Sequence, residues 1–121
     1  MNIHDYTGLH YDFRTHNCWQ YVRRVRSDAG IDTPEFDCAD PSGITDAFER
    51  GREVRKGMVH VSIPRNFDAV LMAAELRGRL VWHSGIYFDG MVSHCDRWAK
   101  QVRLQPLSEI QRDYQRVEFW R

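Results

Sequence analysis

The sequence predicts an α+β fold in a single domain spanning residues 1–121, with N-terminal helices packed on a mainly antiparallel β-sheet. Apolar residues recur with a helical period in the first half of the chain, whereas in the second half they alternate with polar residues. An Asp89-Gly90 pair lies between two apolar, aromatic runs, and such a pair strongly favours a two-residue hairpin turn. A length of 121 residues suits one domain, and no repeat or linker-like stretch divides it.

The expected elements follow one another along the chain. Residues 1–16 form a loop or a short helical turn, and residues 17–29 form a helix with one buried apolar stripe. Gly30 stands where a left-handed residue ends a helix. A second helix is expected over residues 41–50, because Asp40-Pro41 is a cap followed by a proline in the first turn. Strands are expected over residues 59–63, 70–75, 80–88, 91–95, 102–104 and 117–120.

Composition argues against several classes of protein. The 17 basic and 17 acidic side chains balance, which disfavours a dedicated nucleic-acid-binding protein. Three cysteines at wide spacings do not make a disulfide scaffold. No apolar run is long enough to span a membrane and the polar first residues are not a signal peptide, so we expect the chain to be cytoplasmic when made. The common zinc-binding and nucleotide-binding motifs are absent, and we expect neither a metal nor an organic cofactor.

Two histidines are expected to share one face of the predicted hairpin. A tight turn at Asp89-Gly90 pairs Phe88 with Met91, and this register places His83 diagonally across from His94. Gly85 lies between them on the same face, where it would leave room for an approaching helix end. A loop with an odd number of residues would put the two imidazoles on opposite faces, so the expectation depends on the turn.

A cysteine completes the candidate reactive group. Cys18 lies in the first turn of its predicted helix, where the helix dipole favours a thiolate and lowers the thiol pKa. In thiol catalysis the sulfur attacks an acyl carbon, an imidazole protonates the leaving amine, and a third polar group orients that imidazole. We assign Cys18 as nucleophile, His83 as base and acid, and His94 as the orienting residue. Asp96, opposite His83 in the expected register, is the alternative for the third role.

The same residues resemble the NlpC/P60 family of cysteine peptidases over almost the whole chain. In that family a helix start of the type DC-x-x-(L/F)V carries the nucleophile, an HVGIY strand carries the base, and a nearby (V/I)-x-H strand carries the third residue. Asn17 stands where the family usually has Asp, and Trp19 stands where it has a small Ser. The matching segments are Tyr11, Asn17-Cys18-Trp19-Gln20-Tyr21-Val22, Phe67-Asp68-Ala69-Val70-Leu71-Met72, His83-Ser84-Gly85-Ile86-Tyr87-Phe88, Val92-Ser93-His94 and residues 114–121.

The resemblance implies a papain-like fold and hydrolysis of peptidoglycan stem peptides between D-glutamate and a diamino acid. It also implies that the hydroxyl of Tyr11 helps to bind the oxyanion. Trp19 and His16 are expected to border the substrate groove, since they flank the start of the helix. The short form with an Asn-Cys-Trp start looks most like the phage and prophage branch, so we expect tail proteins as partners and the cell wall as the site of action.

Three other interpretations stay open. The helix start at Cys18 also resembles that of CHAP-type amidases in the same superfamily. Cys18, His83, His94 and Cys95 have the residue types of a zinc site, although Cys95 is expected to face away from His94 on a regular strand. The third interpretation is a catalytically silent module with the same fold that binds a wall peptide or a tail protein.

Overall fold

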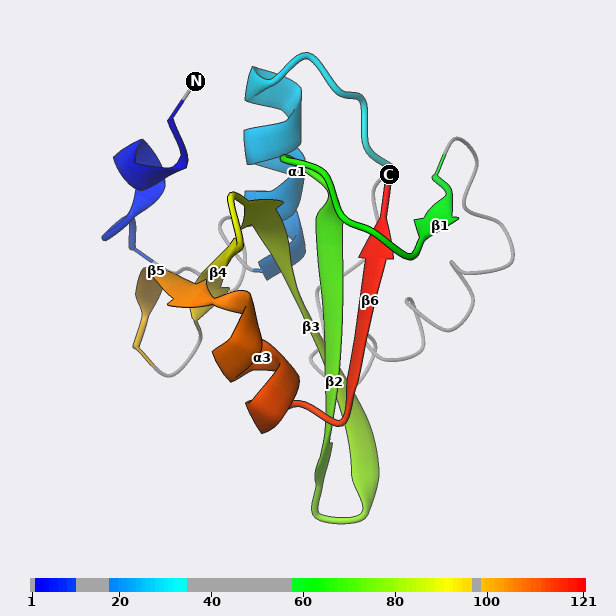
Figure 1. Ribbon diagram of the computed structural model, residues 1–121. Coiled ribbons are helices and arrows are strands. Elements are labelled where there is room, and N and C mark those ends of the chain that lie inside the picture. Colours follow the sequence, from blue (N-terminus) through cyan, green and yellow to red (C-terminus); the bar gives the residue numbers. More distant parts are fainter. Residues whose placement is uncertain (1, 11–17, 35–57, 97–98) are drawn as a thin grey trace.

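A computed structural model describes residues 2–10, 18–34, 58–96 and 99–121. In these parts of the chain, helices combine with one antiparallel sheet, which confirms the predicted α+β class (Figure 1). The strand order is β1-β6-β2-β3-β4-β5, and every pair of neighbours is antiparallel. The elements are η1 (Ile3–Tyr6), α1 (Cys18–Asp28), β1 (His60–Val61), β2 (Ala69–Leu76), β3 (Arg79–Phe88), β4 (Met91–Asp96), β5 (Gln101–Pro106), α3 (Leu107–Asp113) and β6 (Arg116–Trp120).

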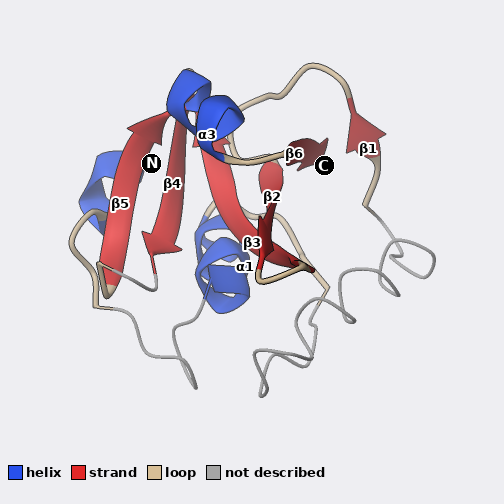
Figure 2. Cartoon of the chain, turned by 90° about the horizontal axis from the view of Figure 1, so that it is seen from below, coloured by secondary structure: helices blue, strands red, loops and turns tan. Residues whose placement is uncertain are grey.

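The sheet has a helix on each face, so the described residues form three layers. Figure 2 shows α1 and α3 on opposite sides of the strands. Helix α1 packs on β3 and β4, while α3 packs on β4, β5 and β6. The core on the α1 side includes Trp19, Tyr21, Val22, Val25, Leu71, Trp82, Ile86 and Cys95, and the core on the α3 side is formed by Val70, Met72, Val92, Ile110 and Phe119.

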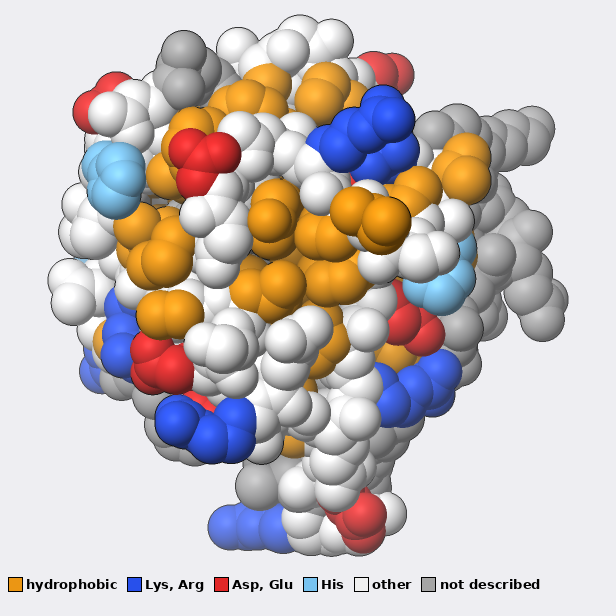
Figure 3. Space-filling view, viewed as in Figure 1, with side chains coloured by type: hydrophobic (Ala, Val, Ile, Leu, Met, Phe, Trp, Pro, Cys, Tyr) orange, Lys and Arg blue, Asp and Glu red, His pale blue; other side chains and the backbone are white. Residues whose placement is uncertain are grey.

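Alternation along the strands decides which side chains reach which layer. On β3, Trp82 and Ile86 point into the α1 core, so Ser84 between them lies on that side. His83 precedes Ser84 and therefore lies on the α3 side. Figure 3 views the α3 side and shows apolar side chains gathered there, in agreement with the half-buried residues around the α3 core, namely Val61, Tyr87, Leu107, Tyr114 and Val117.

Helix α1 ends as the sequence predicts. Gly30 has a φ of +80°, its N–H donates to the Ser27 carbonyl at 2.9 Å, and the Ile31 N–H donates to the Arg26 carbonyl at 2.8 Å. This pair of hydrogen bonds is the Schellman arrangement, which requires a left-handed residue and so favours glycine.

The hairpin between β3 and β4 also has the predicted register. Asp89 and Gly90 both have positive φ values, 48° and 80°, as a type I′ turn requires. Phe88 then pairs with Met91, and the ladder continues to the pair Ile86 and Ser93.

Other predicted elements differ in extent. The strand expected over residues 59–63 is only the two-residue β1, and the five strands expected after it correspond to β2 through β6 with longer bounds. Helix α3 was not predicted, because it is short and begins after Pro106 without a side-chain cap. The helix expected over residues 41–50 lies outside the described residues. Within those residues, the helices are all too short or too polar to cross a bilayer.

Candidate active site

The histidine pair lies on one face of the sheet, as the hairpin register predicts. His83 on β3 and His94 on β4 are hydrogen-bonded through His83 Nε2 and His94 Nδ1, which are 2.9 Å apart. The ring centroids are 5.0 Å apart and the rings are nearly perpendicular, at 81°. The diagonal placement across an antiparallel pair therefore brings the two imidazoles into direct contact.

Gly85 makes this contact possible, but for a reason other than the expected one. A Cβ on Gly85 would lie 2.8 Å from the Ser93 carbonyl oxygen, 2.9 Å from Val92 Cγ1 and 3.0 Å from His94 Cβ. These distances are well below ordinary van der Waals contact. The missing side chain therefore lets β4 approach β3 closely beside His94, and the expectation that it makes room for a helix end was wrong.

A third side chain extends the pair. Gln105 on β5 lies with its Oε1 atom 2.7 Å from His94 Nε2. Sequence reasoning missed this residue, because its position beside His94 follows from the β4–β5 register, in which Val92 pairs with Gln105 and His94 pairs with Arg103. The hydrogen-bonded chain His83–His94–Gln105 is called the imidazole relay below.

Asp96, the alternative third residue, has other partners. Its carboxylate accepts a hydrogen bond from Arg103 at 2.9 Å and one from the Ala99 N–H at 3.3 Å. His94 rather than Asp96 is the residue hydrogen-bonded to His83. Asp96 acts on His83 through its charge, which opposes the lowering of the His83 pKa.

Both imidazoles are neutral near pH 7. Burial and, to a smaller extent, the neighbouring His94 lower the pKa of His83 to about 3. Burial also lowers the pKa of His94, although the hydrogen bond to Gln105 works in the opposite direction. A neutral imidazole can accept a proton, so the relay is in the protonation state that a general base requires.

Cys18 is the first residue of α1, and its side chain is only 6% exposed. Burial raises the pKa of its thiol, while the Ser84 hydroxyl and the backbone N–H groups of Ser84 and Trp19 oppose this effect by hydrogen bonding. The expectation of a lowered thiol pKa at the helix start was wrong, because desolvation outweighs the dipole and these donors. The free protein therefore holds Cys18 as a neutral thiol.

Helix α1 is attached to both histidine-bearing strands at the residues next to the histidines. Cys18 contacts Ser84, which follows His83, and the Tyr21 hydroxyl is 2.6 Å from Ser93 Oγ, just before His94. In the described part of the chain, no hydrogen bond joins Cys18 to either imidazole. The structure therefore brings His83 and His94 together directly, but it does not bring Cys18 into contact with either ring. Cys18 adjoins Ser84 on the α1 side of the sheet, while His83 and His94 lie on the α3 side.

The Ser84 hydroxyl is a further feature of this site. Its oxygen is completely buried and has no hydrogen-bond partner within the described residues. Its hydrogen is therefore available to the neighbouring Cys18 sulfur, and an anion on that sulfur would be better stabilised than a neutral thiol.

The expected groove residues are placed differently or not described. Trp19 has 0% exposure and its indole N–H donates to the Pro34 carbonyl at 2.9 Å, so it packs in the α1 core instead of bordering an open groove. Tyr11 and His16 lie outside the described residues.

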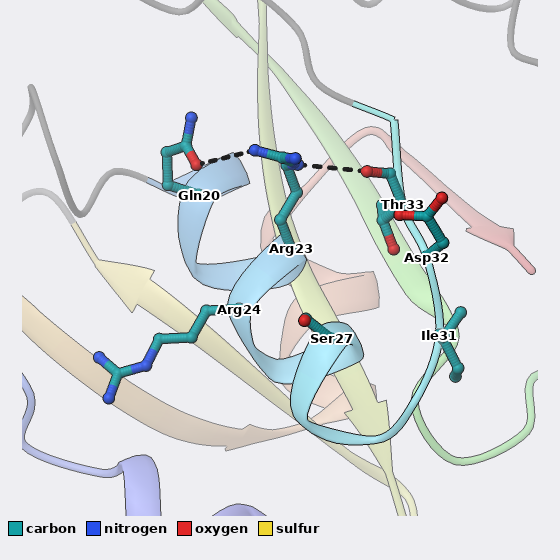
Figure 4. A pocket seen from close by; sticks show the side chains of 7 residues that line it. All are labelled: Gln20, Arg23, Arg24, Ser27, Ile31, Asp32 and Thr33. Atoms are coloured by element: carbon teal, nitrogen blue, oxygen red, sulfur yellow. Dashed lines mark hydrogen bonds between the residues drawn. The ribbon is translucent and has the colours of Figure 1, made fainter.

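A cavity of about 540 Å³ is lined by side chains of α1 and of the segment that follows it (Figure 4). None of the residues of the imidazole relay lines it. The Arg23 guanidinium donates to Gln20 Oε1 at 3.3 Å and to the Thr33 carbonyl at 3.2 Å, so it is already bound within the protein. Arg24 points away from the other labelled side chains. The cavity therefore adds nothing to the candidate active site.

The described residues include no group of three or more His, Cys, Asp and Glu arranged to hold a metal. In particular, Cys95 belongs to the α1 core while His94 is hydrogen-bonded on the other side of the sheet. The proposed zinc set is therefore divided between two layers. No protein-family model matches the chain, and the curated proteins compared with it include no similar sequence.

Proposed function

We propose that this chain is a cysteine hydrolase with a papain-like fold of the NlpC/P60 type, acting on an amide bond in peptidoglycan stem peptides. The observation that carries the proposal is the hydrogen bond between His83 on β3 and His94 on β4. Helix α1 contacts both strands at the residues next to these histidines, through Ser84 and Ser93. A thiol at a helix start and an imidazole held by a second polar group are the parts that thiol acyl transfer needs.

In this mechanism the thiol is deprotonated as it attacks. The pKa of Cys18 is raised and that of His83 is lowered, so the resting pair is neutral and the proton moves when the sulfur bonds to the acyl carbon. His83 Nε2 is engaged by His94, so the mechanism requires the Cys18 sulfur to come within reach of His83 Nδ1, which receives the proton. The imidazolium then donates it to the leaving amine, and a water deprotonated by the same nitrogen hydrolyses the thioester.

The start of α1 supplies donors for the oxyanion of the tetrahedral intermediate. Backbone N–H groups of the first helical turn have no intrahelical acceptor. Those of Trp19 and Cys18 act on the Cys18 thiol by hydrogen bonding, which opposes the rise of its pKa. One such donor is typically worth about 3 kcal/mol of transition-state stabilisation. We propose the hydroxyl of Tyr11 as the second donor, on the resemblance alone.

The bond we propose as the substrate joins D-glutamate to a diamino acid, and the proposed setting is a phage or prophage tail. Both follow from the family resemblance. A CHAP-type amidase would use the same cysteine and histidines on a different amide bond, so only the products of digestion separate the two.

The test is digestion of purified peptidoglycan followed by mass spectrometry of the released fragments. The proposal predicts stem peptides cut after D-glutamate by the wild type and by Cys95→Ala, a control for the loss of a buried thiol other than Cys18. Cys18→Ala and His83→Ala should release no fragments above background. Cleavage elsewhere in the wall would favour a CHAP-type amidase, and binding without fragments would favour a non-catalytic module.

A further inference from the structure

Gln105 occupies a position on β5 from which its side chain reaches the far nitrogen of His94. Strand β5 is antiparallel to β4, with His94 opposite Arg103 and Val92 opposite Gln105. Gln105 is thus the diagonal neighbour of His94 on the same face of the sheet, which brings its Oε1 atom to 2.7 Å from His94 Nε2.

The chemistry of an amide oxygen decides where the protons of both rings lie. Oε1 can only accept a hydrogen bond, so His94 Nε2 carries the hydrogen. In a neutral imidazole the other nitrogen is then an acceptor, so His94 Nδ1 must receive its hydrogen bond from His83 Nε2. His83 Nδ1 is left without a hydrogen, which makes it the basic nitrogen of the pair.

The neighbouring charged groups do not compete for this role. Arg103, directly opposite His94, donates to Asp96 at 2.9 Å and so holds the carboxylate in an ion pair. A carboxylate in the place of Gln105 would favour protonated imidazoles, because a nearby negative charge stabilises the imidazolium. The neutral amide sets the hydrogen-bond direction without adding a charge.

We propose that Gln105 is a positioning residue that fixes the tautomers of His94 and His83, so that the Nδ1 atom of His83 is the free base. This assignment of tautomers deepens the proposed function. Its consequence for catalysis rests on that function, whereas the tautomers themselves do not. Had the Gln105 amide turned its NH₂ group to His94, every donor in the relay would be reversed, and His83 Nδ1 would carry the hydrogen.

The first test is nuclear magnetic resonance of the ¹⁵N-labelled imidazoles, which reports the tautomer of each ring without turnover. The wild type should show both His83 and His94 protonated on Nε2. Gln105→Leu should give mixed tautomers in both rings, whereas Gln101→Leu, an exposed glutamine on the same strand, should leave the spectrum of the wild type. A wild-type His83 protonated on Nδ1, or unchanged tautomers in Gln105→Leu, would overturn the assignment.

The second test compares hydrolysis of a wall peptide by the same variants. Gln105→Leu should lower kcat by about 10- to 100-fold with KM unchanged, in line with the loss of other orienting hydrogen bonds. Gln105→Glu keeps the acceptor, so it should retain the tautomers and move the acid limb of the pH profile to higher pH. A Gln105→Leu enzyme with wild-type kcat would contradict the positioning role. A wild type that hydrolyses nothing would instead refute the proposed function, and the tautomer spectra would still decide the assignment for Gln105.

Discussion

Replacing Gly85 with alanine tests why the two imidazoles can meet. The added Cβ would lie 2.8 Å from the Ser93 carbonyl oxygen, 2.9 Å from Val92 Cγ1 and 3.0 Å from His94 Cβ. None of these atoms is the end of a flexible side chain, so relief requires that β4 moves away from β3. Such a movement would lengthen the His83–His94 hydrogen bond.

The expected cost follows from two opposing effects. Forcing a methyl group into a closely packed site typically costs about 1–3 kcal/mol, mainly through backbone shifts. Alanine is otherwise favoured over glycine within a strand by about 0.5–1 kcal/mol. We therefore expect a net loss of roughly 1–2 kcal/mol, which for 121 residues lowers Tm by about 4–8 °C.

Thermal and urea unfolding measure this loss, and imidazole resonances report the hydrogen bond. Gly78→Ala is the matched control, because Gly78 has a φ of +77° with no atom within 4 Å of an added Cβ. It should also lose stability, through backbone strain, while the histidine resonances stay unchanged. An equal or higher Tm for Gly85→Ala would refute the close approach of β4, since alanine would then show only its favourable strand propensity.

Three further outcomes are expected. His83→Ala should abolish wall-peptide hydrolysis. His94→Ala should retain more activity, because orienting the base contributes less than transferring the proton. An equal loss of activity in both variants would contradict these separate roles. The free energy of unfolding should fall as pH drops from about 6.5 towards 3, because His83 protonates near 6.5 in the unfolded chain and at about 3 in the folded protein. Urea titrations of His83→Gln should show a free energy of unfolding that depends less steeply on pH. Ser84→Ala should slow alkylation of Cys18 by iodoacetamide at neutral pH by about tenfold, since a hydrogen bond to the thiolate is lost; an unchanged rate would show that the hydroxyl does not act on the sulfur.

Local patterns in the sequence predict much of the fold. The Asp-Gly turn determines the β3–β4 register, and that register alone places His83 and His94 on one face. Gly30 marks the end of α1 because only a left-handed residue completes its hydrogen bonds. These features depend on residues close together in the chain, so they can be read from it.

Features that depend on packing between distant segments could not be predicted. The thiol pKa of Cys18 is set by how completely the fold buries it, which the helix position does not reveal. Trp19 lies off the predicted apolar stripe, yet tertiary packing buries it fully. Gln105 reaches His94 only through the β4–β5 register, and the loop between those strands carries no turn signal comparable with Asp-Gly.

The most direct test of the proposed chemistry is to trap the acyl-enzyme. The wild type is quenched with acid during turnover of a wall peptide, and the intact mass and peptide map are recorded by mass spectrometry. A thioester on Cys18, absent from His83→Ala, is the predicted result. Turnover without any adduct, or an adduct on another residue, would contradict the assignment of Cys18 as the nucleophile.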